Sequence, residues 1–96
     1  MEIRIEHAEE GTTGAFFIER EGMRLAEMVY SRSGPAQIII SHTEVHERLQ
    51  GHGVARKLLN ELIMWARETN TRVLATCPYA SAQFAKDPSI RDVFDG

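Results

Sequence analysis

The residues best suited to chemistry lie in one stretch, residues 42–55, which reads HTEVHERLQGHGVA. Gly51 and Gly53 leave the backbone open to a ligand, because glycine has no side chain and tolerates positive φ. The residues that follow predict a helix, and the first N–H groups of a helix are unpaired and carry partial positive charge. This combination is typical of a phosphate site, and a tight loop is the alternative explanation.

Histidines and a thiol supply the groups that could act on a substrate. His42 ends a strand-like apolar segment, and histidine exchanges protons near neutral pH. Cys77 is the only cysteine and follows a second such segment, which leaves a free thiol to be explained. Burial as a small hydrophobic residue is the alternative for this cysteine. His46 and His52 are most simply loop residues exposed to water.

No metal site is expected from these histidines and the cysteine. No pair among them has the close spacing of structural zinc ligands, and the chain has a single cysteine. A resident metal cofactor is therefore not predicted.

Hydrophobic periodicity predicts the elements that position these groups. Alternating apolar and polar residues predict strands, and a wide apolar stripe at helical spacing predicts a helix. The run Ile38–Ile40 predicts a strand buried on both faces. The expected strands are residues 2–7, 15–19, 23–30, 36–43 and 72–76, and the expected helices are residues 53–69 and 80–86.

The strand–helix–strand order over residues 36–76 predicts a βαβ unit with parallel strands and a right-handed crossover. Ligands of such units lie beyond the carboxyl ends of the strands, where the helix N-terminus also points. His42 and Cys77 therefore fall at the same rim. The expected fold class is α/β (α+β), with a mostly antiparallel sheet of about five strands, a parallel pair formed by the fourth and fifth strands, one long crossover helix and a short C-terminal helix.

Composition limits the protein class. Residues 1–96 have the length of a single domain, and 43% hydrophobic with 26% charged residues is typical of a globular protein. The net charge of −3, without a cluster of Lys or Arg, argues against a nucleic-acid partner. No apolar run approaches the roughly 20 residues that cross a bilayer, and the start, MEIRIEHAEE, is unlike a signal peptide. With a lone cysteine, these features predict a cytoplasmic protein without membrane association.

Three segments, HTEVHERLQGHGVARKLL, WARE and VLATCPYASAQFAKDP, resemble the small single-domain GNAT-like N-acetyltransferases. This branch of the GNAT superfamily has a Cys-Pro pair after the fifth strand. QGHGVA, residues 50–55, matches the superfamily's Q/R-x-x-G-x-G/A loop for the pyrophosphate of acetyl-coenzyme A. The similarity covers nearly the whole chain, and residues 38–88 carry most of it. The resemblance implies acetyl transfer from acetyl-coenzyme A to an amine.

The resemblance also implies where the cofactor binds. Backbone groups of Thr43, Glu44 and Val45 would contact pantetheine in a gap between the fourth and fifth strands. N–H groups of residues 50–55 would bind the pyrophosphate, and a cation in the first helical turn would reach phosphate oxygens. The residues expected to bind the cofactor are Thr43, Val45, Gln50, Gly51, His52, Gly53, Val54, Ala55, Arg56 and Lys57.

The resemblance places Cys77 beside the acetyl thioester, where it could accept the acetyl group, with His42 taking the thiol proton. Direct transfer to the amine is the alternative. Glu44 is a second candidate base, since many larger relatives use a glutamate on the fourth strand, and a solvent-facing side chain is the other explanation. Where those relatives have a tyrosine as general acid, this chain has Phe84, with Tyr79 a few residues earlier.

The remaining expectations concern the acceptor and the core. The acceptor stays open among a protein lysine, a peptide and a small amine. The chain itself is expected to be a monomer or a homodimer. A non-catalytic module that binds coenzyme A or acyl-coenzyme A, or a protein-interaction module, is the alternative function. Trp65, Leu58, Leu62 and Phe84 are expected in the core. His7 is expected at the surface or the core edge without an evident partner.

Overall fold

The computed structural model describes residues 3–96 and contains one five-stranded sheet with the strand order β1-β2-β3-β4-β5. β1 to β4 pair antiparallel and β4 pairs with β5 in parallel, so the predicted fold is confirmed. The elements are β1 (Glu6–Glu10), β2 (Thr13–Arg20), β3 (Met23–Gly34), β4 (Gln37–Val45), the 3₁₀ helix η1 (Glu47–Leu49), α1 (Val54–Glu68), β5 (Arg72–Ala75), α2 (Pro78–Lys86) and the 3₁₀ helix η2 (Pro88–Val93).

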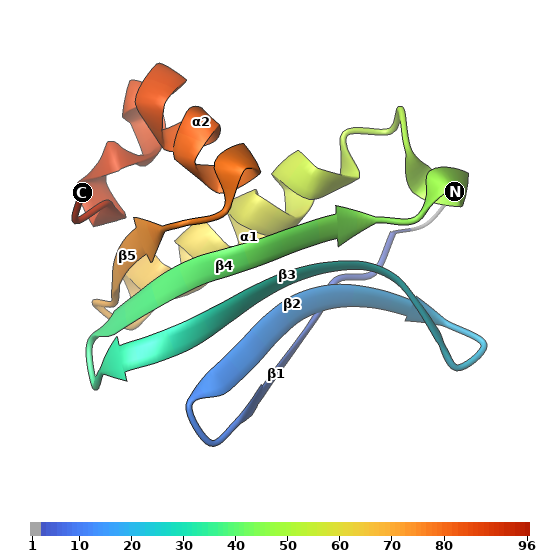
Figure 1. Cartoon of the computed structure of the whole chain (residues 1–96), viewed down its shortest axis with the longest axis horizontal. Coiled ribbons are helices and arrows are strands. Elements are labelled where there is room, and N and C mark those ends of the chain that lie inside the picture. The colour runs from blue at the N-terminus through green and yellow to red at the C-terminus, as the bar shows by residue number, and fades with distance from the viewer. Residues whose placement is uncertain (1–2) are drawn as a thin grey trace.

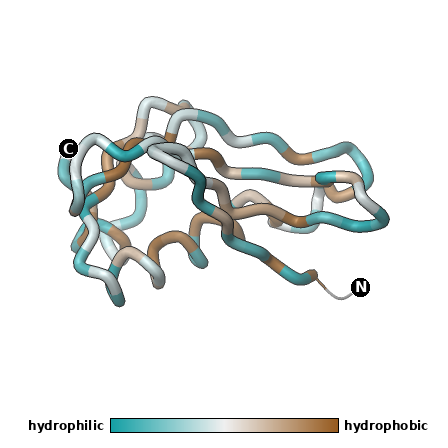
Figure 2. Tube along the Cα trace, turned by 90° about the horizontal axis from the view of Figure 1, so that it is seen from below, coloured by the Kyte–Doolittle hydropathy of each residue, from teal (hydrophilic) through white to brown (hydrophobic). Residues whose placement is uncertain are grey.

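α1 packs along one face of the sheet, and in Figure 1 the opposite face of β1 to β4 is turned toward the viewer without a helix in front of it. Seen along the sheet, the strands and α1 form two layers (Figure 2). α2 lies on the same side as α1, since Arg56 of α1 donates to Gln83 Oε1 of α2 at 2.6 Å. We call the side with the helices the covered face and the other side the open face.

The apolar stripe of α1 holds the two layers together. Its buried residues pack against Met28, Ile38 and Ile40 of the strands, all fully buried. Each fully buried Leu or Ile side chain stabilises the fold by about 1.5–3 kcal/mol. The expected core residues Leu58, Leu62 and Phe84 are buried, and Trp65 packs at the core edge, partly exposed. The buried residues of α1 are Val54, Leu58, Leu59, Leu62, Ile63 and Ala66.

A β-bulge in β4 changes which of its side chains face α1. The β3–β4 register pairs Val29 with His42 and Tyr30 with Ile40, so Ser41 is an extra residue without a partner position. Before the bulge, even-numbered residues such as Ile40 lie on the covered face. After the bulge, odd-numbered residues lie on the covered face and even-numbered residues on the open face.

The strand positions after the bulge therefore separate into two environments. Thr43 pairs with the fully buried Met28 and lies on the covered face. His42 and Glu44 lie on the open face, because successive side chains of a strand point to opposite sides. The burial of these side chains supports this assignment to faces, because His42 and Glu44 are exposed whereas Thr43 is half-buried.

Several predicted boundaries were wrong by a few residues. The first strand, predicted at residues 2–7, is β1 at residues 6–10, because the turn at Gly11 fixes the hairpin register. Ile3 and Ile5 precede it and pack against the core, and residue 2 lies outside the described residues. The fourth strand is not buried on both faces, because Ile39 is partly exposed. α2 begins at Pro78, a residue suited to the first turn of a helix.

His7 has partners that the sequence did not suggest. Its Nε2 lies 2.7 Å from the hydroxyl of Tyr30, and its ring stacks on Phe16 with the centroids 4.0 Å apart. Tyr30 donates to Glu9 at 2.7 Å, and Arg32 also donates to that carboxylate. Burial raises the pKa of Tyr30 and lowers the pKa of His7. These bonds fasten β1 to β3 on the covered face.

Among residues 3–96, no helix is both long enough and apolar enough to cross a bilayer.

Candidate active site

The carboxyl end of β4 has a free edge. The parallel ladder between β4 and β5 ends with Ile40 opposite Ala75, and the N–H groups of Thr76 and Cys77 both donate to the Ile40 carbonyl, at 2.9 and 3.1 Å. β4 continues to Val45 beyond that point. Within the described chain, this last part of β4 is paired to β3 alone, so its other edge faces a gap.

Backbone groups of Thr43 and Val45 point into this gap. The His46 N–H donates to a β3 carbonyl at 2.7 Å, and hydrogen-bonded positions alternate along an antiparallel strand, so Glu44 also faces β3. Thr43 and Val45 then face the other way. In agreement, the Val45 carbonyl accepts a bond from the Gln50 side chain at 3.2 Å. Of the three residues expected to offer backbone contacts to pantetheine, Thr43 and Val45 have the required direction.

The glycine loop leads into α1 with its backbone exposed. Gly51 and Gly53 have φ of 83° and 67°, and a Cβ built on either would find no atom within 4 Å. The first bond of the helix runs from the Lys57 N–H to the Gly53 carbonyl at 3.1 Å. The N–H groups of residues 54–56 therefore have no partner within the helix and can bind an anion.

A cavity of about 260 Å³ lies between this loop, the end of β4 and the start of α2. Most of the predicted cofactor-binding residues line it, whereas Thr43, His52 and Lys57 do not. The lining consists of Val45, Leu49, Gln50, Gly51, Gly53, Val54, Ala55, Arg56 and Tyr79.

Arg56 lines the cavity but has its own partners. Arg56 or Lys57 was predicted to reach phosphate oxygens. The guanidinium of Arg56 instead donates to Asn60 at 2.9 Å, to Gln83 at 2.6 Å and to Asp87. Bonds from the Ser89 hydroxyl and from Arg56 lower the pKa of Asp87 to about 2. Arg56 therefore joins α1 to α2, and a phosphate would have to compete with this ion pair.

Cys77 lies on the covered face at the start of α2. It is the N-cap residue of that helix and is only 4% exposed. Its Sγ lies 3.2 Å from Thr43 Oγ1 across the gap. Either atom of this contact can be the donor, so the Thr43 hydroxyl can donate a hydrogen bond to the sulfur. The side chain of Thr43 therefore contributes to the site, whereas only its backbone was expected to.

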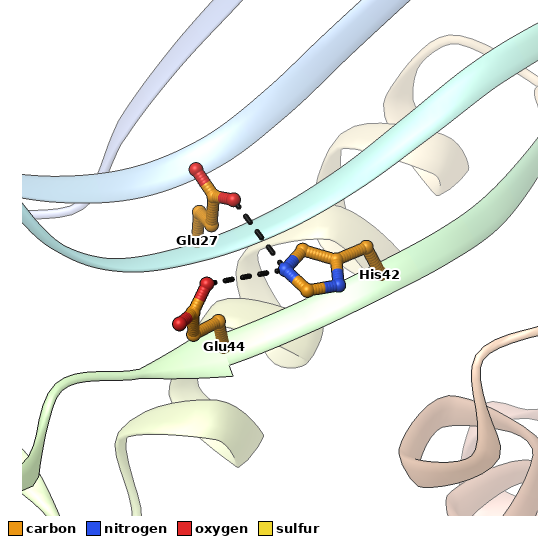
Figure 3. Close-up of side chains that lie close together, drawn as sticks. All are labelled: Glu27, His42 and Glu44. Atoms are coloured by element: carbon orange, nitrogen blue, oxygen red, sulfur yellow. Dashed lines mark hydrogen bonds and ion pairs between the residues drawn. The ribbon is translucent and has the colours of Figure 1, made fainter.

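His42 and Glu44 lie on the open face together with Glu27 of β3. His42 Nε2 is 3.3 Å from Glu44 Oε2 and 3.6 Å from Glu27 Oε2. Figure 3 shows the three side chains on the side of the strands away from α1, with the imidazole ring pointing between the two carboxylates. The structure thus brings together His42 and Glu44 but not His42 and Cys77, which lie on opposite faces of β4.

Sequence reasoning missed Glu27 and named Tyr79 without giving it a role. Glu27 carries no motif, and only the β3–β4 register places it beside Glu44. Tyr79 is half-buried in the cavity wall, and burial raises the pKa of its hydroxyl, which therefore stays protonated. Its place directly after Cys77-Pro78 was the available signal. Phe84 is buried and stacks on Phe94 with the centroids 4.4 Å apart, so it belongs to the core.

Known proteins share this architecture. A family model described as GCN5-related N-acetyl-transferase matches residues 15–93. The chain is similar to a GCN5-like protein from Staphylococcus aureus, with 35% sequence identity and a TM-score of 0.74 over 95% of this chain and 88% of that one. No curated protein matches the chain.

Two further structures share the fold at low identity. A ribosomal-protein-alanine N-acetyltransferase from Brucella melitensis biovar Abortus 2308 has 16% identity and a TM-score of 0.65 over 80% of this chain and 62% of that one. A GNAT family acetyltransferase from Elizabethkingia anophelis, solved with acetyl-CoA bound, has 16% identity and a TM-score of 0.57 over 77% of this chain and 50% of that one. Because the family model matches most of the chain and the Staphylococcus aureus relative is 35% identical, the chain belongs to the GCN5-related N-acetyltransferase family.

Proposed function

We propose that this chain binds acetyl-coenzyme A at the gap beyond β4 and transfers the acetyl group to an amine. The observation that carries the proposal is the cavity that the start of α1 and the end of β4 share, with its exposed N–H groups and free strand edge. The Cys77 thiol does not line this cavity but contacts Thr43 of the same strand end. The pyrophosphate would bind the loop at Gly51 and Gly53, and pantetheine would pair with the backbone of Thr43 and Val45.

In the proposed reaction, the Cys77 thiolate attacks the thioester carbonyl carbon. A new C–S bond to Cys77 forms, the C–S bond to coenzyme A breaks, and the leaving thiolate takes a proton from the Tyr79 hydroxyl. An amine then attacks the acetyl group on Cys77, forming the amide and releasing the cysteine thiolate. The proton lost by the amine passes to His42 or Glu44 on the open face and from there to solvent, which reprotonates Tyr79.

This scheme revises the role first expected for His42. A base on the open face is badly placed for the thiol of Cys77, and Thr43 is the side chain in contact with that sulfur. Direct transfer from acetyl-coenzyme A to the amine would need no cysteine and would still use His42 or Glu44. A variant Cys77→Ala separates the two routes, because only the relay requires the sulfur.

The test of this function is calorimetric titration with acetyl-coenzyme A, followed by measurement of coenzyme A thiol release in the presence of primary amines. We expect saturable binding with one site per chain and amine-dependent thiol release. Binding without release from any amine would favour the non-catalytic module. No binding at all would contradict the proposal.

A further inference from the structure

We propose that the outer edge of β1 binds an extended, basic segment of a partner protein, which joins the sheet as a further strand. This binding does not depend on the proposed acetyl transfer, because β1 lies at one edge of the sheet and the β4–β5 pair lies at the other (Figure 1).

The chain covers one edge of the sheet and leaves the other open. On β5, Val73 forms a parallel bridge with Phe94, and its carbonyl accepts from the Asp95 N–H at 2.8 Å. Within residues 3–96, β1 pairs with β2 alone, and all five of its residues are exposed. An exposed edge with unpaired backbone groups is a template for another strand.

The backbone groups of His7 and Glu9 point outward from this edge. A β3 N–H donates to the Thr12 carbonyl at 2.7 Å, and hydrogen-bonding direction alternates along an antiparallel strand, so Ala15 of β2 faces its partner Ala8 of β1. The same alternation along β1 turns the N–H and C=O groups of His7 and Glu9 away from β2. These four groups are the ones that an added strand would bind.

The free side chains of β1 are acidic. Glu6, Ala8 and Glu10 share the open face, because alternate residues of a strand point to the same side. Glu6 and Glu10 are exposed and have no hydrogen-bond or ion-pair partner among the described residues, whereas Glu9, on the covered face, is bonded to two side chains of β3. Two free carboxylates therefore flank Ala8 on the open side of the edge.

A basic strand fits this pattern, and a second copy of the chain does not. If two copies paired antiparallel about Ala8, Glu6 of each would lie opposite Glu10 of the other, and like charges in opposite positions are destabilising. A segment with Lys or Arg opposite both glutamates and an apolar residue opposite Ala8 would instead form two pairs of opposite charge. On the outer edge these are non-hydrogen-bonded positions, where facing side chains lie closest.

A hollow of about 700 Å³ beside β1 has room for the apolar residue of such a segment. Ala8, Ala15 and Val29 are neighbours across three strands and give it a floor of small apolar side chains. Arg24 is the cation in its wall, and Glu27 accepts from that guanidinium at 3.2 Å. The hollow therefore suits an apolar side chain placed opposite Ala8.

The test is an NMR measurement of amide exchange with the peptide TKTVTKT, blocked at both ends. Its lysines and valine have the spacing of Glu6, Ala8 and Glu10, and its symmetric sequence presents the same side chains in either strand direction. We expect saturable binding, with the amides of His7 and Glu9 exchanging about tenfold more slowly or less in the complex. The Ala8 amide, which already faces β2, should change little.

The double variant Glu6→Gln with Glu10→Gln should weaken peptide binding about fivefold, since two cross-strand pairs of opposite charge are lost. Glu47→Gln with Glu61→Gln is the matched control, because it removes two exposed carboxylates elsewhere and should leave the affinity unchanged. Equal affinities of the two double variants would overturn the proposal.

Two further peptides separate strand addition from general charge attraction. TKTVTKT with N-methyl groups on the threonines that flank valine keeps both charges but loses the donors for the outward carbonyls, and TETVTET keeps the backbone but reverses the charges. We expect both to bind about tenfold more weakly or worse.

Equal binding of either control peptide, or unprotected His7 and Glu9 amides at saturating TKTVTKT, would overturn the proposal. Protection of these amides that rises with protein concentration in the absence of peptide would identify a second copy as the occupant and would also overturn it. The measurement uses no acetyl-coenzyme A, so its outcome is separate from the test of the proposed function.

Discussion

The two faces of β4 at its carboxyl end differ in almost every physical property. On the covered face, Thr43 contacts a cysteine that is 4% exposed, at the N-terminus of a helix. On the open face, the side chains of His42 and Glu44 are 51% and 71% exposed and are hydrogen-bonded to each other. A buried thiol and a solvent-facing acid–base group thus lie on opposite sides of one strand end, the thiol in contact with Thr43 and the acid–base group formed by its two neighbours.

This difference indicates that the end of β4 separates the side of the acyl group from the side of the acid–base groups. Charged groups stay in water, where their solvation costs nothing, and the thiol lies among apolar neighbours that exclude water. In the proposed function, the acyl group arrives on the covered side and the amine on the open side. The bulge at Ser41 sets this division, because a shift of one residue moves every later side chain of a strand to the other face.

The largest expected effect concerns the covered side. Gly53→Glu forces a side chain onto a residue with φ of 67° and adds a negative charge where the pyrophosphate would bind. We expect affinity for acetyl-coenzyme A to fall by about a hundredfold or more in calorimetric titration. Gly11→Glu is the control, with a φ of 62° and equally open surroundings in the β1–β2 hairpin. Similar losses in both variants would mean that backbone strain, not the anion site, is responsible.

A second comparison tests packing on the two faces. A Cβ on Gly14 would lie 2.4 Å from the ring and hydroxyl of Tyr30, so Gly14→Ala displaces a fully buried side chain. We expect the free energy of unfolding to fall by about 1–3 kcal/mol in urea denaturation. Ala8→Ser on the open face should change it by less than about 0.5 kcal/mol. Equal effects would show that the two faces are packed alike.

The Thr43 hydroxyl offers a finer test of the covered face. Thr43→Val keeps the side-chain shape and removes the contact with the Cys77 sulfur. The rate of alkylation of Cys77 by iodoacetamide at neutral pH should fall about tenfold, because a hydrogen bond to the thiolate is lost. Ser41→Ala, at the bulge, is the control and should leave the rate unchanged. An unaltered alkylation rate in Thr43→Val would contradict a role of this hydroxyl in activating Cys77.

The smallest effect is a pH dependence of stability. Burial lowers the pKa of His7 in the folded chain below its unfolded value of 6.5. The unfolded chain therefore binds more protons, and the contribution of His7 to stability is present above pH 6.5 and is lost as the pH falls through the folded pKa. Urea denaturation between pH 7.5 and 5, in wild type and His7→Gln, should show a shallower pH dependence in the variant. Parallel curves would contradict this role.

The sequence predicted the features that depend on local pattern. Helical spacing of Leu58 and Leu62, and two glycines before that helix, were sufficient for the βαβ unit and the exposed loop, which the structure has. What the sequence could not predict depends on register. Nothing in residues 37–45 signals the bulge at Ser41, so His42 was expected to face Cys77.

The sequence also did not predict which side chains far apart in the chain form hydrogen bonds with each other. Arg56 had the position of a phosphate ligand, but its bonds to Gln83 and Asp87 depend on how α2 packs against α1. Tyr30 and His7 are separated by another strand in the sequence and meet only through the β1–β2–β3 register. Such contacts follow from tertiary packing, which a single sequence does not specify at the level of individual atoms.

The most direct test of the account is the intact mass of the domain after mixing with acetyl-coenzyme A, measured first under native and then under denaturing conditions. The account predicts a noncovalent complex in the native spectrum and one acetyl group on the denatured chain, absent in Cys77→Ala and removed from wild type when an acceptor amine is added. A native complex with no covalent acetyl group would contradict the cysteine relay. A native spectrum without any complex would contradict the acetyl-coenzyme A site itself.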